Sequence, residues 1–205
     1  MNATRPKSEL VTPRRWCARR AFTVVELLIV IAILGILLAV ASPYLSSDVP
    51  HQLQMAADSV AGDITYARGL AVANNSSYRL TFNVSASTYV LQHTGATTAL
   101  NKLPPSPFHT FNAGQTQQTA DLSRLPMVAG SVKIAAVKKN PASPSDVTDL
   151  EFGPLGNTTR SDATLIWLYS NSTGSKIYIP ITVNATTGIV DVGDVQAATP
   201  SGVTP

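Results

Sequence analysis

Cysteine is almost absent from this sequence, with Cys17 the only one among 205 residues. Because Cys17 lies within the first 21 residues, the rest of the chain can form neither an internal disulfide nor a thiolate metal site. The three histidines, His51, His93 and His109, have no HxH or HxxxH spacing, and no G-x-S-x-G, P-loop or G-x-G-x-x-G motif occurs. We therefore predict a protein that is not an enzyme and that needs no cofactor and no metal.

Charged residues are also scarce, at 13% of the chain, and they are unevenly distributed. Residues 1–21 hold six cations and one anion, whereas residues 22–205 hold nine cations and eleven anions. The basic pI of about 9.1 therefore reflects the N-terminal segment. Lys133, Lys138 and Lys139 form the clearest cationic group of the remainder. Because nucleic-acid binding needs clustered lysine and arginine on one surface, this charge pattern does not favour a nucleic-acid partner.

A small acidic cluster is formed by Asp146, Asp149 and Glu151. Carboxylates are ligands of Ca²⁺, but no EF-hand spacing accompanies these three residues. A solvated loop is therefore the favoured interpretation of the cluster.

One long apolar run stands out against this background. Leu27 to Ala41 are fifteen consecutive apolar residues, and Phe22 to Val25 extend the run backward across Glu26. At about 1.5 Å per residue, a helix over 22–43 is long enough to cross a hydrocarbon core of roughly 30 Å. Cations precede the run, and none follows it until Arg68. This asymmetry predicts a single-pass protein with a cytoplasmic N-terminus and an exported C-terminal part.

Three interpretations of this segment remain open. It can be a plain signal anchor, or a secretory signal cut after Ala41 at the small-x-small sequence Ala39-Val40-Ala41. The third is a prepilin signal, and Glu26 separates it from the others. A carboxylate in an apolar run costs roughly 2.5–3.5 kcal/mol on insertion, so it indicates a functional requirement that an anchor or a secretory signal does not have.

The sequence RRAFTVVELLIVIAILGILLAVASPYL closely resembles the N-terminal motif of type IV pilins and type II secretion pseudopilins. The resemblance implies that a prepilin peptidase cuts between Ala21 and Phe22 and methylates the new N-terminal Phe22. It also implies that Glu26 pairs with the N-terminal amine of a neighbouring subunit, which sets the register of assembly. Gly35 and Pro43 fall where these helices often bend. The family prefers glycine before the cut, so Ala21 is expected to slow processing.

The remaining sequence predicts a helix followed only by strands. Apolar residues at three- and four-residue steps, from Leu53 to Ala71, predict a helix over about 52–74. Strands are predicted over 78–84, 88–92, 131–138, 149–152, 163–169, 176–183 and 186–192. Pro180 indicates an edge position or a bulge within its strand. The segment 97–126 is interpreted as a long functional or mobile loop, and residues 196–205 as a disordered tail.

A narrower resemblance concerns the start and the end of this part. The sequence ADSVAGDITYARGLAVANNSSYRLTF, with its Ala67-Arg68 pair, is similar to the start of the H-type pseudopilin family (GspH/FimT). EFGPLGNTT and IYIPITVNATTGIVDV resemble the closing hairpins of that family, with a Phe-x-x-x-Gly turn and a Thr-Gly turn. The implied fold is α+β, with a long N-terminal helix, half membrane-embedded and half amphipathic, packed on an antiparallel β-rich domain.

The sequence therefore predicts four parts: a basic leader at 1–21, a transmembrane and filament-core helix at 22–43, a periplasmic domain at 44–195 and the tail. The predicted function is that of a minor pilin or pseudopilin of a type II secretion pseudopilus or a type IV pilus. Its partners are a prepilin peptidase, other pilins and the inner-membrane assembly machinery. The protein is expected in the inner membrane and then in the filament. A DNA-uptake minor pilin and a secreted β-rich protein remain the alternatives.

Overall fold

The computed structural model describes residues 23–41, 49–106, 109–125, 128, 131–172, 175–201 and 203. The chain divides into two compact units, Met1–Ser47 and Asp48–Pro205. Helix α1, Val24–Ala41, belongs to the first unit, and apart from Glu26 and Gly35 its residues are apolar. Among the described residues, no helix combines the length and the apolarity that crossing a membrane requires.

Helix α2, Val49–Ala73, begins the second unit and agrees with the predicted helix at about 52–74. Pro50 lies in its first turn, where the missing N–H of proline costs no helical hydrogen bond. The helix ends in a Schellman motif, in which Asn75 adopts a φ of 47° and the N–H of Ser76 donates to the carbonyl of Ala71 at 3.0 Å. Its buried residues follow the apolar stripe of the sequence: Leu53, Ala56, Ala57, Val60, Ile64, Ala67 and Ala71.

The first sheet has the order β3-β4-β2-β1-β7, and all its pairings are antiparallel. Its strands are β1 (Tyr78–Asn83), β2 (Thr88–His93), β3 (Thr110–Phe111), β4 (Gln117–Asp121) and β7 (Asp149–Phe152). Tyr78, Leu80 and Phe82 alternate along β1 and are buried, as the period of two along a strand requires. The predicted hairpin of the first two strands is confirmed, with Ser87 at a φ of 53° in its turn.

The second sheet has the order β10-β9-β8-β5-β6 and is also antiparallel. Its strands are β5 (Val132–Lys139), β6 (Ser145–Asp146), β8 (Thr164–Ser172), β9 (Ser175–Val183) and β10 (Val190–Val192). The register shifts by one residue between Ile134 and Ala136 in β5. Ile177, Ile179 and Ile181 of β9 belong to the main core, so the side chains between them point to the other face of the sheet.

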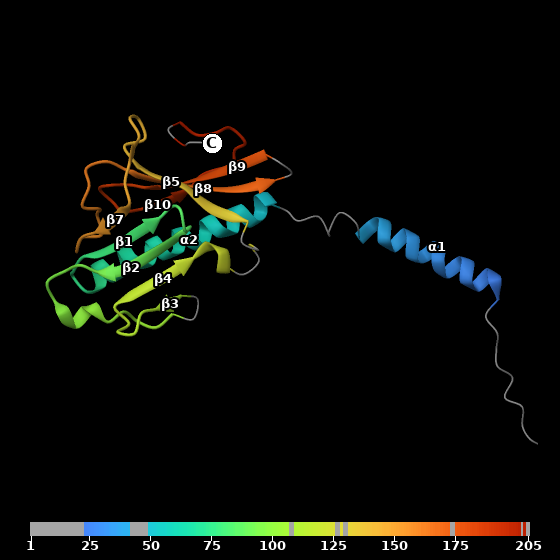
Figure 1. The fold of residues 1–205 in the computed structure, drawn as a ribbon, viewed down its shortest axis with the longest axis horizontal. Helices are drawn as coiled ribbons and strands as arrows, with labels where there is room; N and C mark the ends of the chain where they lie inside the picture. The colour runs from blue at the N-terminus through green and yellow to red at the C-terminus, as the bar shows by residue number, and fades with distance from the viewer. Residues whose placement is uncertain are drawn as a thin grey trace, which may run out of the picture. The chain divides into compact units, whose positions relative to one another are not determined.

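Helix α2 packs against strands of both sheets (Figure 1). Apolar side chains from the helix and both sheets form one continuous core. This is an α+β fold in which the helix supports two antiparallel sheets. The predicted fold class is therefore confirmed.

Two predictions about loops were wrong. The segment 97–126 contributes β3, β4 and the 3-10 turns η2 (Thr98–Asn101) and η3 (Leu122–Arg124), and it buries Leu103 and Leu122 in the core. The region after 195 is not wholly disordered either. The backbones of Gln196 and Tyr178 exchange two hydrogen bonds, of 2.7 and 2.8 Å, and Val203 is buried against Trp167. Each segment pairs with a strand already in a sheet and covers apolar surface, which outweighs its polar composition.

Candidate functional site

The start of α1 is capped by Thr23. Its hydroxyl accepts a hydrogen bond from the N–H of Glu26 at 3.2 Å, and its carbonyl accepts one from the N–H of Leu27 at 3.2 Å. Threonine followed three residues later by glutamate is the sequence pattern of a capping box. The carboxylate also lies in the first turn, where the helix dipole favours negative charge. Glu26 therefore has a role in helix initiation, which the sequence reasoning missed although the T-x-x-E spacing indicates it.

The surface of α1 is apolar on every side. The large apolar side chains from Val24 to Leu38 are 44–76% exposed, so the described residues do not cover them. A helix of this kind needs apolar surroundings. The helix continues through Gly35, where an added Cβ would meet nothing within 4 Å. Ala21, Phe22 and Pro43, the other predicted site residues, lie outside the described residues.

Arg68 joins the three sequence fragments that carried the narrower resemblance. From α2, its Nε donates to the carbonyl of Gly156 at 3.1 Å and to that of Thr187 at 3.0 Å. Gly156 and Gly188 have positive φ values of 79° and 65°, and a Cβ on Gly188 would lie 2.0 Å from the Gly156 carbonyl oxygen. Only glycine allows the two turns to approach so closely. The structure thus makes one clamp of an arginine and two turns that are far apart in the sequence.

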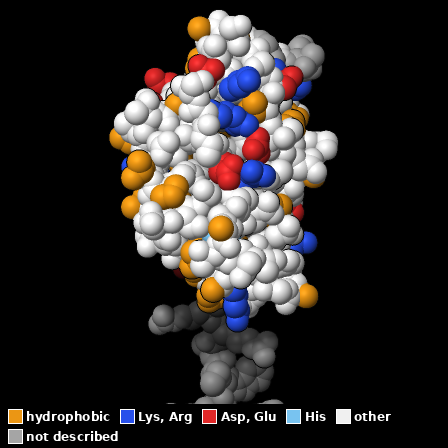
Figure 2. Space-filling view, turned by 90° about the vertical axis from the view of Figure 1, so that its left-hand side faces the viewer, with side chains coloured by type: hydrophobic (Ala, Val, Ile, Leu, Met, Phe, Trp, Pro, Cys, Tyr) orange, Lys and Arg blue, Asp and Glu red, His pale blue; other side chains and the backbone are white. Residues whose placement is uncertain are grey.

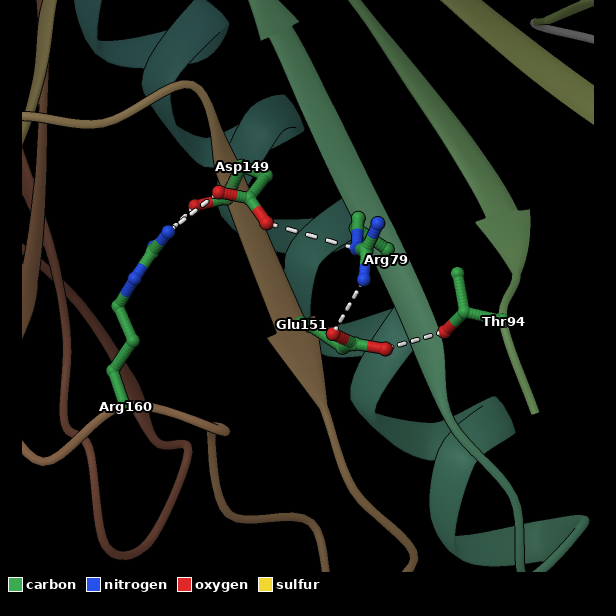
Figure 3. Close-up of polar contacts among 5 residues, drawn as sticks. All are labelled: Arg79, Thr94, Asp149, Glu151 and Arg160. Atoms are coloured by element: carbon green, nitrogen blue, oxygen red, sulfur yellow. Dashed lines mark hydrogen bonds and ion pairs between the residues drawn. The ribbon is translucent and has the colours of Figure 1, made fainter.

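The acidic cluster of the sequence is neutralised by arginines (Figure 3). Arg79 of β1 contacts Glu151 at 2.9 Å and Asp149 at 3.6 Å, both from β7. Arg160 contacts Asp149 at 2.5 Å, and Thr94 donates to Glu151 at 2.5 Å. The hydrogen bond to Glu151 raises the pKa of Arg79. Two carboxylates bound by two guanidinium groups form a structural network with little capacity left for Ca²⁺, and Asp146 instead contacts Lys138.

A second polar cluster ties the segment around His109 to α2. Asp63 accepts hydrogen bonds from the Tyr89 hydroxyl at 2.5 Å and from His109 Nε2 at 2.8 Å, while His109 Nδ1 lies 2.8 Å from the Ser106 hydroxyl. Burial, with the negative charge of Asp63, raises the pKa of Tyr89 well above its ordinary value. Serine, histidine and aspartate can form a nucleophilic triad. The cavity beside them holds only about 10 Å³, roughly one water molecule, so it has no room for a substrate.

The three lysines of the predicted cationic group do not act together. Lys138 is 9% exposed at its side chain and contacts Asp146 at 2.5 Å. Lys133 and Lys139 are exposed near opposite ends of β5. On the face shown in Figure 2, basic side chains lie beside acidic ones and not in a separate basic patch. These observations give no support to an extended nucleic-acid surface. Among the described residues, no group of three or more histidine, cysteine or acidic side chains is arranged to hold a metal.

Residues 16–42 match the prokaryotic N-terminal methylation motif. No curated protein sequence matches the chain. The motif, followed by a domain of one helix and two antiparallel sheets, supports the pilin and pseudopilin superfamily for this chain.

Solved structures resemble the fold at low sequence identity. The minor pseudopilin EpsH of the Vibrio cholerae type II secretion system is 8% identical, with 74% of this chain and 100% of that chain covered and a TM-score of 0.50. The type IV minor pilin FimU of Pseudomonas aeruginosa is 13% identical, with 74% of this chain and 98% of that chain covered and a TM-score of 0.42. At these identities the likeness concerns the fold alone.

Proposed function

We propose that this protein is a minor pilin or pseudopilin, a structural subunit of a type II secretion pseudopilus or a type IV pilus. The observation that carries the proposal is the methylation motif at 16–42, which leads into the capped helix α1 and then into a domain with a pseudopilin-like fold. The motif implies a membrane-anchored protein. In the proposed topology the anchor lies in the inner membrane, with the N-terminus in the cytoplasm and the domain in the periplasm.

Processing is the first proposed step. A prepilin peptidase cuts between Ala21 and Phe22 and methylates the amine of Phe22. The position of Thr23 supports this cut, because the capping residue lies just after it and stays in the mature chain. A cut after Ala41, by contrast, would remove all of α1 together with its cap.

Assembly through α1 is the second step. Its apolar surface is matched by the helices of neighbouring subunits, and the inner-membrane machinery moves it from lipid into the filament. Glu26 pairs with the N-terminal amine of a neighbour, since a carboxylate in apolar surroundings is costly unless it is paired. Gly35 and Pro43 allow the helix to bend as it packs.

Mass spectrometry of the protein extracted from the membrane tests this function. The expected mature chain begins at Phe22 with an N-methyl group. A chain that begins at Ser42 would show a secretory signal, and a chain that keeps residues 1–21 would show a plain anchor. Either result overturns the proposal. An Ala21→Gly variant serves as the matched control, because it restores the residue that the peptidase prefers and is expected to be processed faster.

A further inference from the structure

A groove of about 310 Å³ lies between the β1–β2 turn and the face of the second sheet that points away from α2. Its walls include Lys133 of β5, Tyr169 of β8, and Lys176 and Tyr178 of β9. Ser87 closes one end, where its hydroxyl accepts a hydrogen bond from the N–H of Ile134 at 3.3 Å and joins the turn to the sheet. A volume of this size is large enough for a small polar ligand.

The groove carries positive charge that the described residues do not neutralise. Lys133 and Lys176 are both exposed, no carboxylate lines the groove, and neither lysine has an ion pair within the described part of the chain. Lys176 Nζ lies 5.1 Å from the centre of the Tyr169 ring, which favours a cation there. Lys138 differs from both, because Asp146 neutralises it. The groove therefore attracts an anion.

Tyr178 also lines the groove. The residue as a whole is only 2% exposed, and its hydroxyl makes no hydrogen bond to any described residue. The hydroxyl is not among the buried polar atoms without a partner in the described part of the chain, so it reaches the surface and can donate to a bound ligand. A donor in the wall of a cationic groove is suited to an oxygen of an anionic ligand.

The groove lies at the end of the domain where α2 begins. Lys133 follows Ser131, whose hydroxyl contacts Gln52 in the first turn of α2 at 3.4 Å. Figure 1 shows the β8–β9 hairpin at this same end of the domain. From here the chain continues, through residues 42–48, to the helix of the methylation motif.

We propose that this groove binds the phosphate of an anionic phospholipid headgroup in the membrane that anchors the protein before assembly. A phosphate offers several acceptor oxygens, which satisfy two ammonium groups and a phenolic hydroxyl together. The inference rests on the proposed function in one respect, because that function supplies the membrane from which the phospholipid comes. Binding would hold the domain at the lipid surface and would be lost when the subunit leaves for the filament.

The test uses residues 48–205, which form a separate compact unit that contains both apolar clusters of the domain, so we expect this fragment to fold without α1. Flotation with phosphatidylcholine vesicles, with and without phosphatidylglycerol, measures binding. We expect binding to the anionic vesicles only, with Lys133→Gln and Lys176→Gln each weakening it roughly five-fold. Tyr178→Phe should weaken it roughly ten-fold, because a hydrogen bond to a charged group is lost. Lys139→Gln, the same charge change at the other end of β5, should have little effect.

Several results would overturn this proposal. The first is that Lys139→Gln and Lys133→Gln weaken vesicle binding equally. The second is that the fragment binds inorganic phosphate but not the vesicles. The third is that it binds a single-stranded oligonucleotide or an acidic peptide more tightly than it binds the vesicles. Thermal melts of each variant establish that it is folded. Because this fragment lacks the processing site, a negative result here leaves the N-methyl-Phe22 experiment unaffected, and the two proposals can fail separately.

Discussion

The carboxylate of Glu26 lies in the first turn of α1, three residues after the capping hydroxyl of Thr23. At this position it stabilises the start of the helix, because negative charge is favoured near a helix N-terminus. The proposed pairing with the N-terminal amine of a neighbouring subunit is a second role of the same side chain. The two can be separated, because glutamine also serves in a capping box but carries no charge.

Glu26→Gln is therefore expected to leave the helix start and membrane insertion intact and to impair assembly. The measurement is the amount of the subunit in sheared filaments relative to the membrane fraction. Thr23→Ala is the matched control, since it weakens the cap by about 1 kcal/mol and keeps the charge. Normal incorporation of Glu26→Gln would contradict the pairing role.

Gly188 is the most constrained glycine of the Arg68 clamp. Gly188→Ala places a Cβ 2.0 Å from the Gly156 carbonyl oxygen at a φ of 65°. We expect the free energy of unfolding of residues 48–205 to fall by about 2–4 kcal/mol, measured by urea denaturation. Gly62→Ala is the opposite case, because Gly62 is exposed within α2 with nothing within 4 Å of the added Cβ. It should raise stability by about 0.5–1 kcal/mol, and a loss there equal to that of Gly188→Ala would contradict the clamp.

At the scale of elements, regular patterns were predictable and irregular ones were not. The stripe from Leu53 to Ala71 predicts α2, and alternation predicts the two hairpins, because in both cases apolar side chains face one core. Of the two possibilities that Pro180 indicated, the edge position is wrong, because β9 lies between β10 and β8. The bulge is confirmed: Tyr178 and Thr182 are four positions apart in the sequence, whereas their partners Gln196 and Asp191 are five positions apart. No comparable pattern marked β4, whose inward positions are Gln118 and Ala120.

The candidate site was predictable in part. The resemblance of residues 19–45 predicted the methylation motif, which the match at 16–42 confirms, and the assembly role of Glu26 stays a prediction. The same residues contain the T-x-x-E spacing that indicates the Thr23 cap. The Arg68 clamp and the cationic groove could not be derived, because their members come from strands and turns that only the tertiary fold brings together. Arg68, for example, is 88 and 119 residues from its two partners.

Gln118 gives a test at the scale of β4. Its side chain is buried, and its Oε1 has no hydrogen-bond partner within the described residues. Gln118→Met keeps the size of the side chain and removes this unpaired oxygen. The free energy of unfolding, measured by urea denaturation, should therefore stay unchanged or rise by about 1 kcal/mol. Gln117→Met, on the exposed face of the same strand, is the control and should change little. A clear loss of stability in Gln118→Met alone would show that the amide has a partner in solution.

For the domain as a whole, Tyr89 predicts how stability depends on pH. Burial, and the nearby Asp63, raise the pKa of Tyr89 in the folded state, whereas an unfolded tyrosine ionises near about 10. The folded state therefore holds the proton more tightly. This contribution is fully present below about pH 10 and is lost as the pH rises above that value toward the folded pKa.

Urea midpoints on either side of about pH 10 measure this dependence. Tyr89→Phe should be less stable at neutral pH, because the hydrogen bond to Asp63 is lost, but its stability should decline less steeply in alkali. Part of the decline should remain, since burial also raises the pKa of Tyr78 and Tyr66. An identical alkaline slope in both proteins would exclude Tyr89 as a contributor.

The Arg68 clamp also has a consequence for biosynthesis. A ribosome makes Arg68 long before the carbonyl of Thr187, so α2 emerges with one of its side-chain partners still 119 residues away. Until Thr187 is made, the guanidinium can donate only to the Gly156 carbonyl or to water, and the turn that holds Gly188 does not yet exist. The second glycine turn can therefore join the domain only after most of the chain has been made.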